Sequence, residues 1–574
     1  MTKSHTLGLG LSLLLALHAS SQPVLADQSP ASSTEWWREA KFGLFIHWGP
    51  VSLQGTEIGW SRAGERRGLG WGGPGTEVPV EVYDSLYKRF NPIRFDAGEW
   101  ARIASEAGMK YVVLTTRHHD GFSLWDTQAS SYKITAPECP FGRDVVRELS
   151  EATRKAGLRW GVYYSQPDWH HPDAYTRNHS RYQAYLQDQL RELLGNYGKV
   201  DILWYDGLGD HREEYRSAEM NALARKLQPS ILINNRNGFP EDFDTPEQRV
   251  GQMQVGRPWE TNMTLCQQWS WRPNDTMKSL EECLRILVTT VTGDGNLLFN
   301  VGPMPDGRIE PRQVERLREI GAWLGKNGTA VYRTRGGPWV NGAWGGSTHR
   351  GDRIFVFLLR KPAGGVLTLS GNPGRVLKAS LLGSSQAVTF SQEEKRLSLQ
   401  VPASAFGSPI PILELQLAEP VVTGRLLGQA GMAFEDESLY GKPRKATAST
   451  VPASAASLQE SDAGWSIDMA SGPAPALVFD LGEPRLITGL SAVSGETGAF
   501  AANHVLELEM SLDGKTWESV GQASYGLPSW EFPVVHMREG AEHIGRSFRY
   551  VRLEAKQGEG RHSLHLRKVR IFAK

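Results

Sequence analysis

Histidines, acidic residues, an arginine and aromatic residues recur at the ends of short apolar segments in the first half of the chain. Side chains that hydrogen-bond suit the hydroxyl groups of a polyol, and aromatic faces suit the apolar edge of a sugar ring. Cleavage of a glycosidic bond requires two carboxylates, one to attack the sugar or activate water and one to donate a proton. We therefore expect a sugar-cleaving site. In chain order its candidates are His47, Glu57, His118, His119, Asp120, Tyr164, Trp204, Asp206, Arg236, Glu247, Glu260, Trp269 and Trp271.

A metal-assisted hydrolase is the main competing interpretation. His47, His118, His119, Asp120 and Asp206 could hold a metal, because imidazole and carboxylate groups ligate zinc and manganese. Tryptophan and tyrosine crowd the same positions, however, and the first apolar segment lacks a His-x-His pair. We therefore expect no metal and no cofactor for catalysis.

A non-catalytic glycan-binding protein, made of a degenerate barrel and a lectin-like tail, is the alternative from a different class. Loss of Asp206, or of both Glu247 and Glu260, would favour it, because hydrolysis requires the carboxylates. All three residues are present, so the sequence favours an enzyme.

Alternating strand and helix patterns surround these residues over 27–335. One helical pattern follows Asp96 and stops at Gly108, and another follows Asp144 and stops at Gly157. This alternation predicts parallel strands, and its length favours a (β/α) TIM-like barrel, whose site lies at the carboxyl ends of the strands. A doubly wound sheet is less favoured, because no glycine-rich phosphate loop follows the first strand. The candidate strands are 42–47, 111–115, 160–164, 200–205, 231–234 and 296–301.

The chain beyond the barrel is predicted to be all β. Segments such as 353–360 and 412–417 alternate apolar and polar residues, which indicates a β-sandwich over 336–420. A second β unit is expected over 421–574, with a hairpin turn signal at 513–515.

Bulk composition excludes some partners. The 63 basic and 63 acidic residues cancel, so we expect no nucleic-acid partner and no attraction to an anionic membrane. The three cysteines are an odd number without short spacing, which argues against a disulfide framework and a zinc site.

The first 26 residues are predicted to be a signal peptide. Lys3 precedes an apolar run over 7–17, and Ala26 ends a small-residue cleavage site. The run is short for a membrane span, so we expect an exported protein, periplasmic or secreted, without membrane insertion.

Six segments in order resemble the α-L-fucosidases of glycoside hydrolase family 29. The resemblance implies a barrel followed by a β-sandwich, a retaining mechanism and fucosylated oligosaccharides or glycoconjugates as substrates. It also implies Asp206 as the nucleophile and Glu57 at the rim. The segments are "KFGLFIHWGP", "TEIGWSR", "RHHDGFSLW", "LWYDG", "DTPEQ" and "GNLLFNVGPMPDG". The fucose pocket that the family implies is His47, His118, His119, Tyr164, Trp204, Arg236 and Trp271.

The acid/base position varies within this family. We favour Glu247 in "DTPEQ", because it follows Arg236 in the same loop, and Glu260 in "PWE" is the alternative. The segments "TEIGWSR" and "WSWRPND" are similar to the subfamily that prefers α-1,3 and α-1,4 links on Lewis-type glycans. A broad-specificity enzyme acting on α-1,2, α-1,6 and aryl fucosides is the alternative.

The last unit resembles the discoidin, or coagulation-factor type C, module that binds carbohydrate. The segments "VFDLG" and "SLDGKTW" carry this similarity, and the chain departs from the usual pattern around Trp465. Such modules often hold a structural calcium ion, which is the cofactor this resemblance implies.

Overall fold

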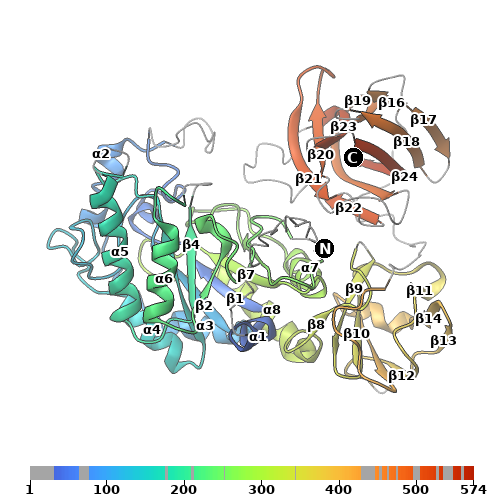
Figure 1. Cartoon of the computed structure of the whole chain (residues 1–574), viewed down its shortest axis with the longest axis horizontal. Helices are drawn as coiled ribbons and strands as arrows, with labels where there is room; N and C mark the ends of the chain where they lie inside the picture. The colour runs from blue at the N-terminus through green and yellow to red at the C-terminus, as the bar shows by residue number, and fades with distance from the viewer. Residues whose placement is uncertain are drawn as a thin grey trace, which may run out of the picture.

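The computed structural model describes residues 31–573, apart from 64–76, 175–178, 208–211, 251–252, 343, 385, 428–446, 452–455, 462–463, 473–475, 495–504, 525–528, 534–546 and 557–561. The predicted signal peptide lies outside the described residues. Figure 1 shows three groups of elements in chain order: strands with helices around them, then the group containing β9–β15, then the group containing β16–β24.

Seven parallel strands form the sheet that carries the candidate residues. Its order is β5-β4-β3-β2-β1-β7-β6, with β2 at its centre and every neighbouring pair parallel. The sheet is curled, as expected for a TIM-like barrel. The strands are β1 (Phe42–Ile46), β2 (Tyr111–Arg117), β3 (Arg159–Ser165), β4 (Ile202–Asp206), β5 (Leu232–Ile233), β6 (Glu260–Thr264) and β7 (Asn296–Val301).

An irregular segment, residues 243–247, connects the two edge strands β5 and β6. It forms a parallel bridge from Phe243 to Asn234 after β5, and another from Glu247 to Asn262 within β6. We call residues 243–247 the seam. The curled sheet is therefore closed on this side by isolated bridges rather than by a continuous ladder of strand hydrogen bonds.

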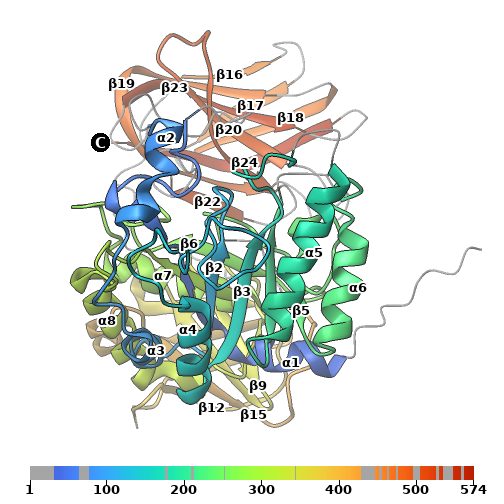
Figure 2. The same ribbon diagram turned by 90° about the vertical axis from the view of Figure 1, so that its left-hand side faces the viewer.

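Helices cover the outside of the curled sheet. In Figure 2, helices α3, α4, α5 and α6 lie on the outer side of β2 and β3. Asp96 and Asp144 accept hydrogen bonds from the first turns of α3 and α4, which confirms both predicted helix starts. The helices are α1 (Ala31–Ala40), α2 (Val80–Tyr83), α3 (Ala97–Glu106), α4 (Val145–Lys155), α5 (His179–Gly195), α6 (Ser217–Leu227), α7 (Leu280–Thr292) and α8 (Pro311–Asn327).

Side chains alternate between the inside of the curl and the helices. Along β4, Leu203 and Tyr205 join the buried cluster that packs on the helices, whereas Ile202 and Trp204 join the interior cluster. Because the side-chain period of a strand is two, Asp206 continues the interior set. The strand that ends on a carboxylate therefore delivers it to the mouth of the curl.

Two antiparallel sheets follow and share one buried core. The five-stranded sheet has the order β12-β15-β10-β9-β8, and the three-stranded sheet has the order β11-β14-β13. Their strands are β8 (Arg335–Gly336), β9 (Gly345–Arg350), β10 (Arg353–Leu358), β11 (Val366–Ser370), β12 (Val376–Leu381), β13 (Phe390–Glu393), β14 (Arg396–Gln400) and β15 (Ile412–Leu417).

The last group is a nine-stranded sheet in which β19 pairs with four other strands. The side chain of Trp465 is outside the described part of the chain, so the departure noted in the sequence is not placed. The strands are β16 (Thr447–Val451), β17 (Ala456–Ser461), β18 (Gly464–Gly472), β19 (Ala476–Ser494), β20 (Val505–Ser511), β21 (Glu518–Ser524), β22 (Ser529–Pro533), β23 (Ser547–Lys556) and β24 (His562–Ala573).

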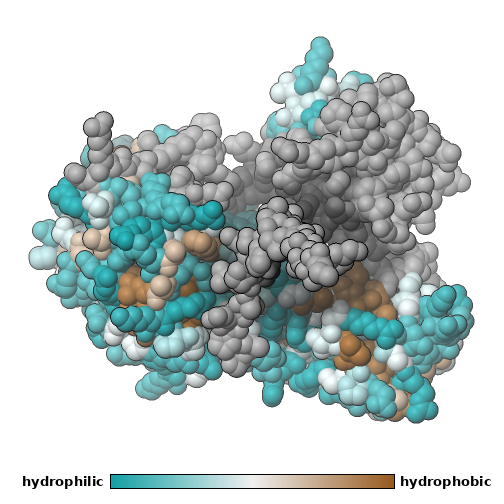
Figure 3. Space-filling view, in the orientation of Figure 1, coloured by the Kyte–Doolittle hydropathy of each residue, from teal (hydrophilic) through white to brown (hydrophobic). Residues whose placement is uncertain are grey.

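None of the helices that the structure describes is long and apolar enough to cross a membrane. Hydrophilic side chains cover most of the described surface over the helices in Figure 3, with apolar side chains in smaller patches.

Candidate active site

Asp206, the last residue of β4, is held by two side-chain donors and lies beside a histidine. Its Oδ2 accepts a hydrogen bond from the Tyr163 hydroxyl at 2.6 Å and lies 3.5 Å from His119 Nε2. Its Oδ1 accepts from the Arg236 guanidinium at 3.3 Å. Burial raises the pKa of Asp206, and the charge of Arg236 and the Tyr163 hydrogen bond oppose that rise. The two donors therefore favour the ionised form that a nucleophile needs.

Arg236 contacts both Asp206 and Glu247. One terminal nitrogen reaches Asp206, and the other forms an ion pair with Glu247 Oε2. The guanidinium carbon lies 4.8 Å from the ring centre of Trp204, and Nε donates to Thr245 Oγ1 at 3.0 Å. The planar guanidinium of Arg236 thus holds Glu247 of the seam and Asp206 of β4 at the same site.

Glu247 is the more exposed of the two carboxylates. Its side chain keeps 29% of its surface accessible, against 14% for Asp206. A buried carboxylate beside a more accessible one fits the pair of carboxylates that cleavage of a glycosidic bond requires, because a leaving group and water approach the proton-transferring group from solvent.

Hydrogen bonds fix the tautomers of His47 and His119. Asn300 donates its Nδ2 to the Trp269 carbonyl at 2.7 Å, so its Oδ1 accepts from His47 Nδ1 at 2.7 Å. Ser165 donates its hydroxyl to the Pro167 carbonyl at 2.6 Å, so His119 Nδ1 must donate to Ser165 Oγ at 2.7 Å. The Nε2 atom of each neutral ring is then an acceptor.

Burial keeps these histidines uncharged. It lowers the pKa of His47 and of His119 to about 3, and it lowers the pKa of His118 well below its usual value. His119 Nε2 and Asp206 Oδ2 face each other as two acceptors, and a hydroxyl group placed beside them could donate to either. The neutral histidines are therefore suited to receiving hydrogen bonds from a polyol.

His118 stacks on Tyr163. The two rings are 5.5 Å apart at an angle of 4°, and His118 Nδ1 is buried without a hydrogen-bond partner. Gly59 approaches this ring so closely that a Cβ there would lie 2.8 Å from Nδ1, and its φ is +67°. The loop before β2 can pass over His118 because residue 59 is glycine.

Aromatic rings line the site on two sides. Trp269 lies beside His47 with ring centres 4.7 Å apart. Trp60 and Trp169 meet edge to face at 5.1 Å and both contact the ring of His119. Such faces suit the apolar surface of a sugar.

Tyr164 does not face this site, which corrects the sequence expectation. Its side chain lies among the helix-facing residues, and its hydroxyl donates to Gln189 of α5 at 3.1 Å. Its neighbour Tyr163 points inward and reaches Asp206. The shift by one residue follows from strand alternation, because adjacent side chains of β3 point to opposite faces.

Glu57 joins two loops at the rim. Its carboxylate accepts hydrogen bonds from the backbone nitrogens of Trp269 at 2.9 Å and of Ser270 and Ile58 at 3.1 Å. Burial raises the pKa of Glu57 to about 7, and these hydrogen bonds oppose the rise. Its contacts position the loop that carries Trp269.

Trp271 is half-buried at the end of that loop. Its indole Nε1 is buried without a hydrogen-bond partner. Its backbone passes Gly302, where a Cβ would lie 2.4 Å from the Trp271 nitrogen. The tryptophan of this loop whose ring contacts His47 is Trp269 instead.

Glu260 and Asp120 lie away from the paired carboxylates. Glu260 is fully buried at the first position of β6, the opposite end of the strand from the mouth. Asp120 accepts a hydrogen bond from the Tyr83 hydroxyl at 2.7 Å, and Tyr83 accepts from the Gly59 nitrogen at 2.8 Å. The geometry therefore favours Glu247 over Glu260 as the partner of Asp206, and Asp120 anchors the loop around Gly59.

Among the described residues, His118, His119 and Asp206 form one group whose ligand atoms lie within 4.8 Å of one another. Tyr163 and Arg236 already donate to the two oxygens of Asp206. A cation bound there would have to compete with the neighbouring guanidinium charge.

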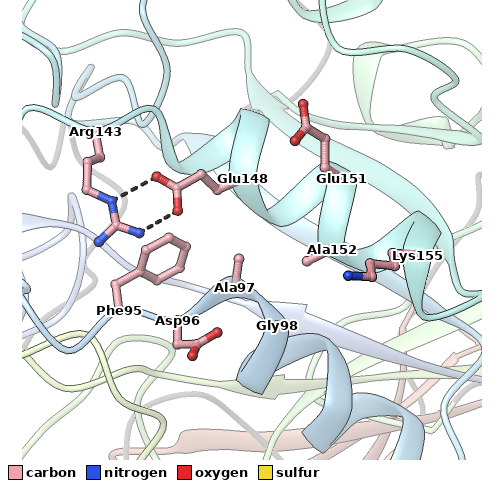
Figure 4. A pocket seen from close by; sticks show the side chains of 9 residues that line it. All are labelled: Phe95, Asp96, Ala97, Gly98, Arg143, Glu148, Glu151, Ala152 and Lys155. Carbon is pink, nitrogen blue, oxygen red and sulfur yellow. Dashed lines mark hydrogen bonds and ion pairs between the residues drawn. The ribbon is translucent and has the colours of Figure 1, made fainter.

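A surface pocket of about 490 Å³ lies between α3 and α4, away from this site. Figure 4 shows its wall, where Arg143 pairs with Glu148 beside Phe95. Its remaining lining residues are Asp96, Ala97, Gly98, Glu151, Ala152 and Lys155. It holds none of the predicted catalytic residues.

Tyr163, Asn300, Ser165, Trp60 and Trp169 belong to the site and were not singled out from the sequence. Tyr163 and Asn300 could have been found by requiring that inward residues of one strand alternate. The contacts of Trp60, Trp169 and Ser165 depend on loop conformations, for which the sequence carries no comparable signal.

The sequence is similar to those of known proteins. A family model described as Alpha-L-fucosidase matches residues 15–329. The plasma alpha-L-fucosidase of Homo sapiens is 32% identical over 421 residues, covering 66% of this chain and 86% of the human protein. The human tissue alpha-L-fucosidase is 29% identical over 455 residues, covering 70% of this chain and 94% of that protein.

Solved structures are similar as well. Alpha-L-fucosidase isoenzyme 1 from Paenibacillus thiaminolyticus superposes with a TM-score of 0.61 at 33% identity, covering 67% of this chain and 99% of that one. A family 29 alpha-L-fucosidase of Bacteroides thetaiotaomicron, solved as a trapped covalent intermediate with 2-fluoro-fucosyl fluoride, has a TM-score of 0.61 at 26% identity. It covers 67% of this chain and 96% of its own.

Proposed function

This chain belongs to the alpha-L-fucosidase family and is a glycoside hydrolase acting on fucosylated substrates, and we propose that it releases terminal α-L-fucose with retention through Asp206 and Glu247. The observation that carries this proposal is Arg236, whose two terminal nitrogens contact one carboxylate each. Retaining glycosidases hold their two carboxyl groups about 5 to 5.5 Å apart, and a shared guanidinium is compatible with that spacing.

The reaction follows a double displacement. An oxygen of Asp206 attacks the anomeric carbon and forms a glycosyl ester, while protonated Glu247 gives its proton to the departing glycosidic oxygen. Glu247, now ionised, then takes a proton from water as the water oxygen displaces Asp206 from the sugar. Fucose leaves, Asp206 is again a carboxylate and Glu247 is again protonated.

The remaining site residues bind the sugar. The Nε2 atoms of His47 and His119 are placed to accept hydrogen bonds from hydroxyl groups, as their tautomers require. Trp269 supports His47 and offers an apolar face for the methyl-bearing side of a 6-deoxy sugar. Glu57 anchors the rim loop that carries Trp269, and Trp271 lies at the end of that loop; both contribute to sugar binding through this loop.

The substrate we propose is a branched glycan with α-1,3- or α-1,4-linked fucose, of Lewis type. Its support is the sequence of the rim segments 56–62 and 269–275. The aromatic pair Trp60 and Trp169 next to His119 supplies a surface for the sugars beyond fucose.

The other parts of the chain have proposed roles as well. Residues 336–420 are assigned as a β-sandwich domain behind the barrel domain of 27–335. Residues 421–574 are assigned as a discoidin-like carbohydrate-binding module with a structural calcium ion. The support for the module is its all-β strand content and the segments "VFDLG" and "SLDGKTW". Removal of residues 1–26 would deliver the protein to the periplasm or medium.

Turnover of 4-nitrophenyl α-L-fucoside tests the assignment of the carboxylates. The wild type, Asp206→Ala, Glu247→Ala and Glu260→Ala variants are assayed with and without azide. We expect Asp206→Ala and Glu247→Ala to lose about 10³-fold or more of kcat, and azide to restore turnover of Glu247→Ala as a fucosyl azide.

Azide rescue of Glu260→Ala instead would overturn the choice of acid/base. A Lewis-type trisaccharide and an α-1,2-fucosyl lactose tested in parallel separate the linkage-selective enzyme from one of broad specificity. A wild type that binds these glycans but releases no fucose from any of them would be the glycan-binding protein of the alternative.

A further inference from the structure

We propose that Glu260 is a positioning residue whose carboxyl group fixes the indole of Trp204, and that Trp204 in turn aligns Arg236 and Tyr163 with Asp206. This inference rests on the proposed function, because it takes Asp206 and Glu247 as the reacting carboxylates. It gives a role in catalysis to a group that cannot touch the substrate.

Glu260 lies at the amino end of the curled sheet with none of its surface exposed. Its Oε1 accepts a hydrogen bond from Trp204 Nε1 at 3.1 Å, and its Oε2 is hydrogen-bonded to the Tyr111 hydroxyl at 2.5 Å. Three strands, β6, β4 and β2, therefore meet through one carboxyl group. Such a contact fixes the position of the indole in the interior of the curl.

Trp204 connects this buried group to the site. One face of Trp204 lies 4.8 Å from the Arg236 guanidinium, and its ring lies 5.6 Å from Tyr163 at an angle of 16°. Arg236 and Tyr163 are the two residues that donate to Asp206. A tilt of the indole would therefore move both donors at once.

The surroundings of Glu260 favour a neutral carboxyl group. Within the described part of the chain, no basic side chain forms an ion pair with Glu260, and burial raises its pKa to about 7. A neutral carboxyl group accepts from Trp204 Nε1 at its carbonyl oxygen and donates its O–H to the Tyr111 oxygen, and the carbonyl and NH2 of a glutamine amide can make the same two hydrogen bonds. Glu260→Gln should therefore retain activity. The same substitution at an acid/base residue would abolish proton transfer and lower activity.

Steady-state kinetics on 4-nitrophenyl α-L-fucoside test this role with Glu260→Gln, Glu260→Met and Trp204→Phe. We expect Glu260→Gln to keep kcat within about threefold of the wild type, and Glu260→Met to lower kcat by about 10- to 100-fold, because a misplaced site loses rate on that scale. KM should change less than kcat, and azide should rescue neither variant.

A double-mutant cycle shows whether the effect passes through Trp204. In the Trp204→Phe background the indole N–H is absent, so Glu260→Met should lower kcat by no more than about threefold further. Equal losses in both backgrounds would overturn the proposal. If Glu260→Met fails to fold, Glu260→Gln still decides, since an inactive, folded Glu260→Gln contradicts a positioning role.

The wild type separates this inference from the function on which it rests. If the wild type releases fucose and Glu260→Met matches its kcat, only the positioning role fails. If the wild type releases no fucose from the aryl substrate or from either oligosaccharide, the proposed function itself fails.

Discussion

Arg236 keeps the charges of the two carboxylates in balance. Replacing it with methionine removes the cation that opposes the rise in the pKa of Asp206. We expect the acidic limb of the kcat/KM profile to move to higher pH, because less of Asp206 is then ionised at a given pH. Arg236→Lys keeps the charge but cannot span both carboxylates, so it should lower kcat/KM by about 100-fold with the limb in place. An acidic limb that stays in place in Arg236→Met would contradict this role.

Tyr163 and Tyr164 give a matched pair of substitutions. Tyr163→Phe removes a 2.6 Å hydrogen bond to Asp206, and hydrogen bonds to charged groups contribute about 1.5 to 3 kcal/mol. We expect kcat to fall by about 10- to 100-fold. Tyr164→Phe removes a contact to Gln189 on the helix side and should leave kcat unchanged while slightly lowering the thermal midpoint. If Tyr164→Phe lowered kcat more than Tyr163→Phe in the same assay, Tyr164 rather than Tyr163 would point into the site.

The reactive residues were predictable where their type is rare at their position. Asp206 stands out because a carboxylate ends an apolar run, and the structure places it at the mouth of the curl. Tyr163 did not stand out, because a second tyrosine follows it. Only the alternation of side chains along the strand decides which of the two points inward.

At the level of the elements, the hydrophobic runs predicted the interior strands well. Strands β1, β2, β3, β4, β5 and β7 lie where apolar residues continue for several positions. Strand β6 was missed, because its sequence "ETNMT" is largely polar although all five residues are buried. Its polar side chains are held by partners such as Trp204 and Gln248, which a single sequence does not display.

A buried carboxylate ties the amino ends of the neighbouring strands β1 and β7 to β8 and α1. Asp294, just before β7, pairs with Lys41 before β1, with Arg335 of β8 and with Arg38 of α1. Its pKa is lowered by these cations and by the Gly336 nitrogen, which together outweigh the effect of burial. One anion thus neutralises part of a cluster of three cations.

Asp294→Asn should therefore destabilise the protein strongly. Removing one partner of a buried ion pair costs about 3 to 5 kcal/mol, and here three cations lose it. The contribution of Asp294 is present above the pKa of the unfolded chain and is lost as pH falls through the lower folded pKa. Urea unfolding at pH 7 and pH 3 should show a difference that shrinks at low pH. The exposed pair of Glu99 and Arg102 supplies the control, since Glu99→Gln should change stability by less than about 1 kcal/mol.

For the whole molecule, two sets of buried groups give opposite dependences of stability on pH. Burial raises the pKa of Glu57 and Glu260 to about 7 and lowers that of His47 and His119 to about 3. The glutamates favour the folded state at low pH, and the histidines favour it at higher pH. The two contributions have opposite slopes between about pH 4.5 and 6.5, so the stability of the wild type should depend weakly on pH in that range.

The Glu260→Gln variant isolates the contribution of one of these groups to the pH dependence of stability. Native Glu260 keeps its proton up to about pH 7, whereas the unfolded chain releases it near pH 4.5. The contribution of Glu260 to the stability of the wild type is therefore lost as pH rises between those values. The difference in unfolding free energy, variant minus wild type, should increase on the order of 3 kcal/mol from pH 4.5 to pH 8. Calorimetry of both proteins over this range measures it, and a constant difference would show that the carboxyl group is ionised throughout.

The order of the three parts of the chain was predictable as well. A helix-and-strand region followed by two all-β regions appears in the structure with β8 beginning at Arg335. The curl is closed by the seam rather than by a regular strand, and that detail depends on isolated bridges that leave no periodic pattern in the sequence.

Because Glu247 lies in the seam and Asp206 in a strand, the surroundings of the two carboxylates should differ in how well they tolerate insertions and substitutions. Asp206 belongs to a strand hydrogen-bonded along both edges, whereas Glu247 belongs to a segment joined to its neighbours by single bridges. Insertions near Glu247 can lengthen or redirect its loop without shifting the register of any strand. With Glu247 as the proposed proton donor, the segment that carries it is the adjustable part of the site, and directed evolution toward new leaving groups should accumulate its changes in and around residues 243–247.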